Sequence, residues 1–302
     1  MPRLCKYRRM SENEIYQPTV PRTMREISVR GANYCLYEWG NTKAPLLFYL
    51  HGWADTGSTF QFVVDALSAD WHIVAPDWRG FGRSSCDCTS YWFPDYLADL
   101  HALLDIFSPG EPARLIGHSM GANIASLYAG SLPERVQSFV NIEGFGLPDS
   151  DPNDAPGRYR RWIETAEEGT SFNEYADFGT LARRIRKRYP AMSMPEASFV
   201  AEEWAIQELD GAVRLRADPR HKLPNPVLYR RAEAEACCRA VTAEVLLVLG
   251  GNSRFGREFG RKATLMFPDG KSKTIEDAGH MLHFETPAAL AREIEGFLLP
   301  SL

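Results

Sequence analysis

The chain has 302 residues, of which 44% are hydrophobic and 24% charged, a balance typical of a globular protein. The formal net charge is -5, and residues of both signs are interspersed, so the composition gives no reason to expect a nucleic-acid partner. No apolar run is long enough to cross a bilayer. No apolar segment follows the basic residues near the N-terminus, so we expect neither a membrane span nor a secretory signal.

We expect the six cysteines to be reduced thiols in a cytoplasmic protein. Their spacing matches no zinc-binding pattern, and two of them are adjacent and could pair with each other only under strain. The six are Cys5, Cys35, Cys86, Cys88, Cys237 and Cys238.

From residue 23 onward, strand-like and helix-like patterns alternate. Strands are predicted at 25–30, 34–39, 46–50, 71–75, 113–116, 136–142, 245–249 and 272–275. Helices are predicted at 60–67, 94–106, 122–132 and 287–298. Such alternation predicts an α/β fold with a mainly parallel eight-stranded sheet and helices on both faces.

Two segments depart from this alternation. Residues 1–22, which contain Pro18 and Pro21, are predicted to form a loosely held arm. Residues 147–240 are rich in charge and aromatic side chains with few strand-like runs, which indicates a mostly helical cap inserted between core segments 23–146 and 241–302. A basic cluster at 183–188 is either an anion patch or a solvated helix face. We interpret it as a solvated face, with Arg184 and Arg188 one turn apart.

Ser119 is the candidate nucleophile. It lies at the centre of Gly117-His118-Ser119-Met120-Gly121, directly after an apolar strand and before a helix. A sharp strand-to-helix turn strains the serine backbone and lifts its hydroxyl clear of the sheet, and the flanking glycines avoid collisions with neighbouring backbone. The alternative is a turn serine without chemistry.

Two further motifs follow predicted strands. In His51-Gly52-Trp53, the backbone N–H of Trp53 can meet that of Met120 and form an oxyanion hole. The loop Asp77-Trp78-Arg79-Gly80-Phe81-Gly82-Arg83-Ser84 contains nothing that must be catalytic. We expect Arg79 together with Asp77 to buttress that loop.

These motifs, in this order, resemble the α/β-hydrolase family. The resemblance covers about residues 25 to 298 and is carried by HGW, DWRGFGRSS, GHSMG and AGHMLHFETP. It implies the α/β-hydrolase fold with a helical cap, but it does not define the substrate, because one fold hosts many chemistries.

A serine nucleophile needs a base, and His280 is the candidate. It follows the last predicted strand in Asp277-Ala278-Gly279-His280, the place at which the family carries its base. His283 is the second choice and is expected to begin the last helix. The remaining histidines lie in loop motifs, a strand, a helix and the insertion: His51, His118, His72, His101 and His221.

The acid is the unusual member of the triad. Most of the family carries an Asp soon after the strand at 245–249, where this chain has Asn252. An amide supplies no charge, and the corresponding change in a serine protease costs about 10⁴ in kcat. The segment 135–148 resembles a subgroup of haloalkane dehalogenases in which the acid is a Glu at the place of Glu143. The resemblance implies that role for Glu143 alone, because the dehalogenase nucleophile is an Asp.

Three alternatives to a catalytic Glu143 stay open. Asp277 is a rival acid, although its closeness to His280 along the chain tends to point its carboxylate away. Glu143 could instead form a structural ion pair. The third hypothesis is that Asn252 was introduced to disable the enzyme.

These residues predict a serine hydrolase, most simply a carboxylesterase that acts on small-molecule esters through an acyl-enzyme. The aromatic residues of the cap and Tyr91-Trp92-Phe93 are expected to line an apolar pocket. The alternatives are a C–C bond hydrolase of diketone-type substrates, in which Arg79 or Arg254 would bind a carboxylate, and a non-catalytic ligand-binding protein. No metal or organic cofactor is required by these residues, and the sequence does not reveal the oligomeric state.

Overall fold

The computed structural model describes residues 15–299, except for the side chains of Phe259, Arg261, Lys262 and Ala263. Its main sheet contains eight strands in the order β1 (Arg22–Val29), β2 (Ala32–Gly40), β4 (His72–Pro76), β3 (Leu46–Leu50), β6 (Ala113–His118), β7 (Val136–Ile142), β11 (Glu244–Gly250) and β12 (Lys271–Ile275). A ninth strand, β5 (Ser85–Cys86), pairs with β2 off this path. Pairing is antiparallel around β2 and parallel from β4 to β12, so the predicted mainly parallel sheet is confirmed.

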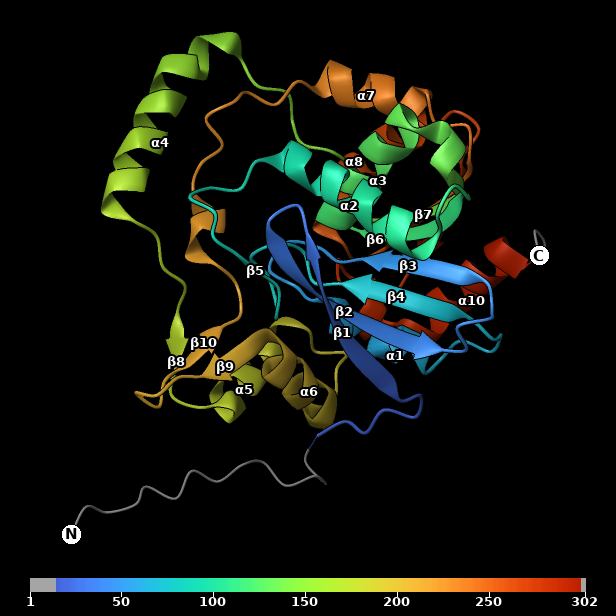
Figure 1. Ribbon diagram of the computed structural model, residues 1–302, viewed down its shortest axis with the longest axis horizontal. Helices are drawn as coiled ribbons and strands as arrows, with labels where there is room; N and C mark the ends of the chain where they lie inside the picture. The colour runs from blue at the N-terminus through green and yellow to red at the C-terminus, as the bar shows by residue number, and fades with distance from the viewer. Residues whose placement is uncertain (1–14, 300–302) are drawn as a thin grey trace.

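Helices cover both faces of this sheet (Figure 1). On one face lie α2 (Phe93–Phe107), α3 (Met120–Ser131) and α8 (Arg254–Met266), and on the other α1 (Gln61–Val64), α9 (Leu282–Glu285) and α10 (Pro287–Leu298). Successive side chains of a strand point to opposite faces. In β7, Phe139 therefore joins the core under α2 and α3, while Val140 joins the core under α1 and α10.

The segment between β7 and β11 carries four α-helices and a small sheet. The helices are α4 (Ala155–Glu168), α5 (Phe178–Arg188), α6 (Met194–Trp204) and α7 (Arg231–Arg239). The sheet consists of β8 (Glu174–Tyr175), β10 (Val213–Leu215) and β9 (Ala205–Gln207) and was missed by the sequence analysis, because strands of two or three residues show no alternation. Short 3-10 turns complete the chain at Gly57–Phe60, Pro133–Arg135, Pro152–Asp154 and Pro219–Lys222.

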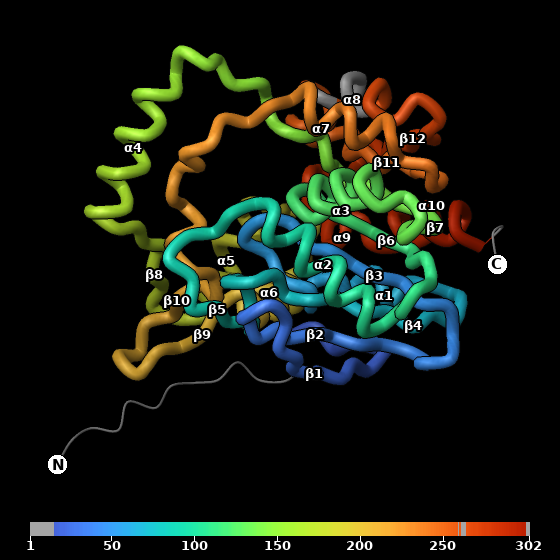
Figure 2. Tube along the Cα trace, turned by 45° about the horizontal axis from the view of Figure 1, so that its top comes forward, coloured from blue at the N-terminus to red at the C-terminus, as the bar shows by residue number. Residues whose placement is uncertain are grey.

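These elements contact the core through α5 and α6, through α7, and through the segment after β10, where the N–H of Asp218 donates to the carbonyl of Gly80 at 2.8 Å. Figure 2 shows α5 and α6 at one end of the molecule and α7 beside α3. Leu181 of α5 and Phe199 of α6 form a third apolar cluster with Phe62 and Met281 of the core. On the other side, α7 packs so closely on α3 that a Cβ on Gly130 would lie 1.9 Å from the carbonyl oxygen of Cys237. By contrast, α4 projects from the body and all its side chains are at least partly exposed (Figure 1).

The described part of the N-terminal arm is held against the body. The hydroxyl of Tyr16 donates to Asp65 at 2.7 Å, and the N–H of Val20 donates to the same carboxylate at 2.7 Å. The backbone N–H of Tyr16 also donates to the carbonyl of Pro195 at 2.9 Å. These bonds fix residues 16–20 between α1 and α6, and residues 1–14 of the predicted arm lie outside the described residues.

One prediction about the cysteines was wrong. Cys86 and Cys88 form a disulfide, with their Cα atoms 5.2 Å apart. That separation is within the usual range for a disulfide, and the sequence analysis had not considered a pair two residues apart. Cys35, Cys237 and Cys238 are free thiols, and Cys5 lies outside the described residues. Within residues 15–299, the structure contains no helix of the length and apolarity needed to cross a bilayer.

Candidate active site

Ser119 occupies a strained turn between β6 and α3. Its φ of 51° is rare for a residue with a Cβ, and its N–H donates to the carbonyl of Ile142 at 2.8 Å, which holds the turn against β7. The turn requires Gly121, because a Cβ there would lie 2.0 Å from the carbonyl oxygen of Leu50. The strain predicted from the motif is thus present, and it belongs to the serine itself.

His280 lies on the loop after β12, and its ring faces Ser119. Its Nε2 is 3.1 Å from the hydroxyl oxygen of Ser119, within hydrogen-bond distance. The backbone of this loop is also held in place, because Nε2–H of His118 donates to the carbonyl of His280 at 2.8 Å. His118, adjacent to the serine in the chain, therefore also orients the histidine.

Glu143 completes a chain of hydrogen bonds through this site. It directly follows β7 with a φ of 56°, and its carboxylate is fully buried. Its Oε2 lies 3.1 Å from Nδ1 of His280, and its Oε1 accepts the N–H of Gly250 at 2.8 Å. The hydroxyl of Ser253 donates to the same Oε2. A buried carboxylate is stable only when such donors satisfy it, and here three of them converge.

The two alternative positions for the acid, residues 252 and 277, are both exposed. Asn252 is exposed, and its backbone N–H donates to the carbonyl of Ala278 at 2.9 Å. Asp277 is also exposed, as its closeness to His280 in the chain had indicated. Ser253, which the sequence analysis did not consider, contacts Glu143 and also accepts the N–H of Gly256 at 3.1 Å as the N-cap of α8. Its position before a helix was the available signal.

His283 is a buried structural histidine. Its Nε2 lies 3.0 Å from the carboxylate of Asp55, which also accepts bonds from Thr59 and the indole of Trp204. Burial would raise the pKa of Asp55, but the hydrogen bond and charge of His283 hold it below its ordinary value. Burial lowers the pKa of His118 well below its ordinary value, so its ring stays neutral.

Within the described residues, one group of side chains could together ligate a metal. It consists of Asp55, His118 and His283, whose ligand atoms lie within 4.8 Å of one another. The bonds that Asp55 already accepts would have to break first. A structural role explains the cluster.

Gly52 and Trp53 pass directly beside the serine. A Cβ on Gly52 would lie 2.8 Å from Nδ1 of the buried His118 and 3.2 Å from Cβ of Ser119, so glycine allows this close approach. His51 fixes the turn, because its Nε2 accepts the N–H of Trp78 at 2.8 Å while Nδ1–H donates to the carbonyl of Gly52 at 2.7 Å. Burial lowers the pKa of His51 to about 4, consistent with a neutral ring in both roles.

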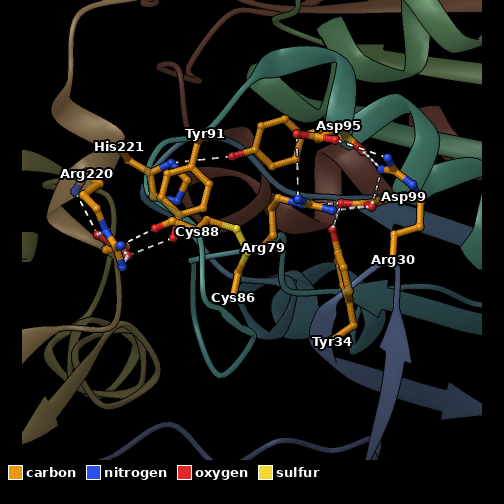
Figure 3. The surroundings of a disulfide bond; sticks show 12 residues. Arg30, Tyr34, Arg79, Cys86, Cys88, Tyr91, Asp95, Asp99, Arg220 and His221 are labelled. Atoms are coloured by element: carbon orange, nitrogen blue, oxygen red, sulfur yellow. Dashed lines mark hydrogen bonds and ion pairs between the residues drawn. A yellow bond between two sulfur atoms is a disulfide. The ribbon is translucent and has the colours of Figure 1, made fainter. Parts of the chain in front are cut away.

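The loop after β4 is buttressed differently from the prediction. Asp77 does hold it, accepting the N–H groups of Gly57 and Arg83 at 2.8 and 2.7 Å. Arg79, however, does not pair with Asp77. It reaches Asp99 of α2 through two bonds of 2.5 and 2.6 Å, as Figure 3 shows. This buried pair joins the loop to α2, in addition to the bonds that Asp77 makes within the loop.

A cavity of about 360 Å³ lies over Ser119 and His280. Its apolar walls come from Trp53, Phe172, Tyr175, Leu181, Ile185, Tyr189, Trp204, Leu215, Phe255 and Met281, and Arg184 and Arg188 also line it. The residues expected to bind a carboxylate in a C–C bond hydrolase are not part of this wall. Arg254 is exposed beside Glu258 and Arg79 is paired with Asp99. Tyr91, expected at the pocket, instead stacks on His221 with ring centroids 3.6 Å apart (Figure 3).

A parallel sheet with a serine on a strained turn after β6 and a histidine after β12 defines a hydrolase of the α/β type. Comparison with known proteins agrees, because the model of the alpha/beta hydrolase fold matches residues 45–287. The chain therefore belongs to the α/β-hydrolase fold family.

Several individual proteins are similar to this chain. A serine hydrolase-like protein of Danio rerio is 29% identical over 87% of this chain and 84% of its own. The 2-(acetamidomethylene)succinate hydrolase of Mesorhizobium japonicum is 26% identical over 84% of this chain and 88% of its own. Among solved structures, the thioesterase domain from the curacin biosynthetic pathway superposes with a TM-score of 0.83 at 26% identity, covering 91% of this chain and 99% of that domain.

Proposed function

We propose that this hydrolase is a carboxylesterase that cleaves esters with apolar groups through Ser119, His280 and Glu143. The observation that carries the proposal is the hydrogen-bond chain from the hydroxyl of Ser119 through both ring nitrogens of His280 to the buried carboxylate of Glu143. A weak nucleophile, a base and a charge that orients the base are the three parts that acyl transfer needs.

The proposed reaction proceeds in two halves. Nε2 of His280 takes the proton from Ser119 as its Oγ attacks the ester carbonyl carbon, and the alcohol leaves with that proton, which gives an acyl-enzyme. Water then loses a proton to the same nitrogen and attacks the acyl carbon, which releases the acid and restores Ser119. The backbone N–H groups of Trp53 and Met120 are proposed to stabilise the oxyanion of both tetrahedral intermediates.

Glu143 is proposed to replace the acid that most of the family carries after β11. Its carboxylate keeps the proton of His280 on Nδ1, so that Nε2 is free to act as a base, and it stabilises the imidazolium that forms. The position of Asn252 supports this assignment. Its side chain is exposed, and Nδ1 of His280 already has Glu143 as its partner, so no acid is needed at residue 252. The same observation weakens the interpretation of a non-catalytic protein, which rested on Asn252.

The test is hydrolysis of p-nitrophenyl butyrate together with labelling by a fluorophosphonate, a reagent that reacts with activated serines. We expect turnover and a single labelled site in the wild type, and loss of both in Ser119→Ala. Ser131→Ala is a matched control, because Ser131 is an exposed serine at the end of the same helix α3. An unlabelled wild type would refute the serine mechanism.

The same assay separates this proposal from its rivals. A wild type that is labelled but cleaves only a diketone panel would be a C–C bond hydrolase. We further propose that residues 147–240 act as a cap over the active site. The cytoplasmic location expected from the cysteines stays a prediction, and the Cys86–Cys88 disulfide counts against it.

A further inference from the structure

One face of α5 forms part of the wall of the active-site cavity. Four of its residues line the cavity at positions i, i+3, i+4 and i+7, which is the spacing of residues on a single helix face: Leu181, Arg184, Ile185 and Arg188. The two apolar members are buried, whereas the two arginines are exposed to the cavity side of the helix. The basic cluster is therefore not only a solvated surface, because half of its arginines face the active site.

Within the described part of the chain, these two guanidinium groups have no counter-charge. Neither Arg184 nor Arg188 forms an ion pair with a carboxylate among residues 15–299. No Asp or Glu of that range contributes to the cavity wall at all. Other arginines of the same insertion are paired, for example Arg214 with Asp210 at 2.6 Å. The cavity thus combines an apolar wall, a nucleophile and two unneutralised positive charges.

We propose that Arg184 and Arg188 bind a carboxylate carried by the substrate, so that the preferred substrates are esters with a short apolar chain and a free carboxylate. This inference rests on the proposed esterase function and extends it. A guanidinium presents parallel N–H donors that match a carboxylate, and the apolar residues of the same wall can contact the chain that carries it. The cavity volume lies at the lower end of the range for small-molecule sites, which favours a short chain.

The test compares the mono-p-nitrophenyl ester of adipic acid with p-nitrophenyl hexanoate, two substrates with the same leaving group and acyl-chain length. A second pair, 4-carboxyphenyl and phenyl hexanoate, places the carboxylate on the alcohol side. We expect kcat/KM of the wild type to favour the charged ester in one of the two pairs by about tenfold or more. In Arg184→Gln and Arg188→Gln that ratio falls at least tenfold, mainly through KM, and added salt lowers it in the wild type.

The control variant is Arg186→Gln. Arg186 belongs to the same helix and has the same charge, but it lines a separate hollow with Arg183 and Lys187. In Arg186→Gln, the ratio of kcat/KM for the charged ester to kcat/KM for the uncharged ester should equal that of the wild type. This result would separate a local contact from the general electrostatic field of a basic helix.

The outcomes distinguish the two proposals. Hydrolysis of both esters with ratios that are unchanged in Arg184→Gln and Arg188→Gln would overturn the carboxylate site and leave the esterase standing. An equal fall in Arg186→Gln would also overturn it. If no ester is cleaved and no serine is labelled, the proposed function itself fails.

Discussion

Replacement of Glu143 by Gln tests the role of the buried acid with almost no change of volume. The amide oxygen is expected to face the N–H of Gly250, because the opposite orientation would set the amide N–H groups against that donor. Such an unsatisfied donor costs about 1–3 kcal/mol, which leaves the opposite orientation in about one molecule in six to about one in 160. The amide nitrogen then occupies the place of Oε2, beside Nδ1 of His280.

This orientation reverses the tautomer of His280. Its Nδ1 must accept a hydrogen bond from the amide N–H, so the ring carries its own proton on Nε2, the atom 3.1 Å from Ser119. A protonated Nε2 cannot act as a base, and in the minority orientation the charge that stabilises the imidazolium is still missing. We expect kcat to fall about 10³–10⁴-fold with a small change in KM, which corresponds to about 4–5.5 kcal/mol of transition-state stabilisation.

The assay is the initial rate of p-nitrophenyl butyrate hydrolysis, with circular dichroism to show that the variant is folded. Asp277→Asn is the matched control, because it neutralises the rival acid, and it should retain the wild-type rate. A Glu143→Gln variant within tenfold of the wild type would refute the reasoning, and so would an equally large loss in Asp277→Asn.

Three further predictions concern stability and pH. Gly121→Ala should lower the free energy of unfolding by several kcal/mol, since its Cβ would lie 2.0 Å from the carbonyl oxygen of Leu50. The control is Gly296→Ala in α10, where nothing lies within 4 Å of the added Cβ. In urea unfolding it should be neutral or stabilising by up to about 1 kcal/mol. Ser253→Ala should lower stability by about 1 kcal/mol through the lost N-cap of α8, and it should lower kcat through the lost hydrogen bond to Glu143. Ser253→Thr keeps the hydroxyl and should restore both. Wild-type kinetics in the alanine variant would contradict the contact with Glu143. Burial lowers the pKa of His221 to about 4, below the unfolded value of 6.5, so its contribution to stability is present above pH 6.5 and is lost as pH falls toward 4. The wild type should therefore lose about 2 kcal/mol relative to His221→Gln between pH 8 and pH 5, and a constant difference in urea unfolding would show that His221 is not held neutral.

Much of the core could be predicted from the sequence because its strands are continuous apolar runs with clear ends. The strands Leu46–Leu50 and Val136–Ile142 and the helix Pro287–Leu298 have the predicted bounds. The helix Arg254–Met266 was not predicted, because Gly256 and Gly260 have low helix propensity and weaken its helical pattern.

Features that depend on packing between distant segments could not be predicted. The partner of Arg79 is Asp99, twenty residues further on, and only the docking of α2 against the loop brings them together. The direction of Arg184 and Arg188 depends in the same way on which face of α5 is buried. The sequence shows one helical face at this spacing but contains no sign of what that face covers.

The turns at Ser119 and Glu143 form a matched pair. Ser119 is the first residue beyond β6, and Glu143 is the first residue beyond β7. The two strands are neighbours and pair in register at His118 and Ile142. The φ angles of Ser119 and Glu143 are 51° and 56°. Adjacent strands are about 4.8 Å apart, so the sheet itself sets the separation of these two backbones. The loop of His280 then brings the third member of the proposed triad to these two residues. With Glu143 as the proposed acid, the segment between β11 and α8 supplies no member of the triad. It acts as a support instead, because the hydroxyl of Ser253 donates to Glu143 and the backbone N–H of Asn252 donates to the carbonyl of Ala278 in the loop of His280.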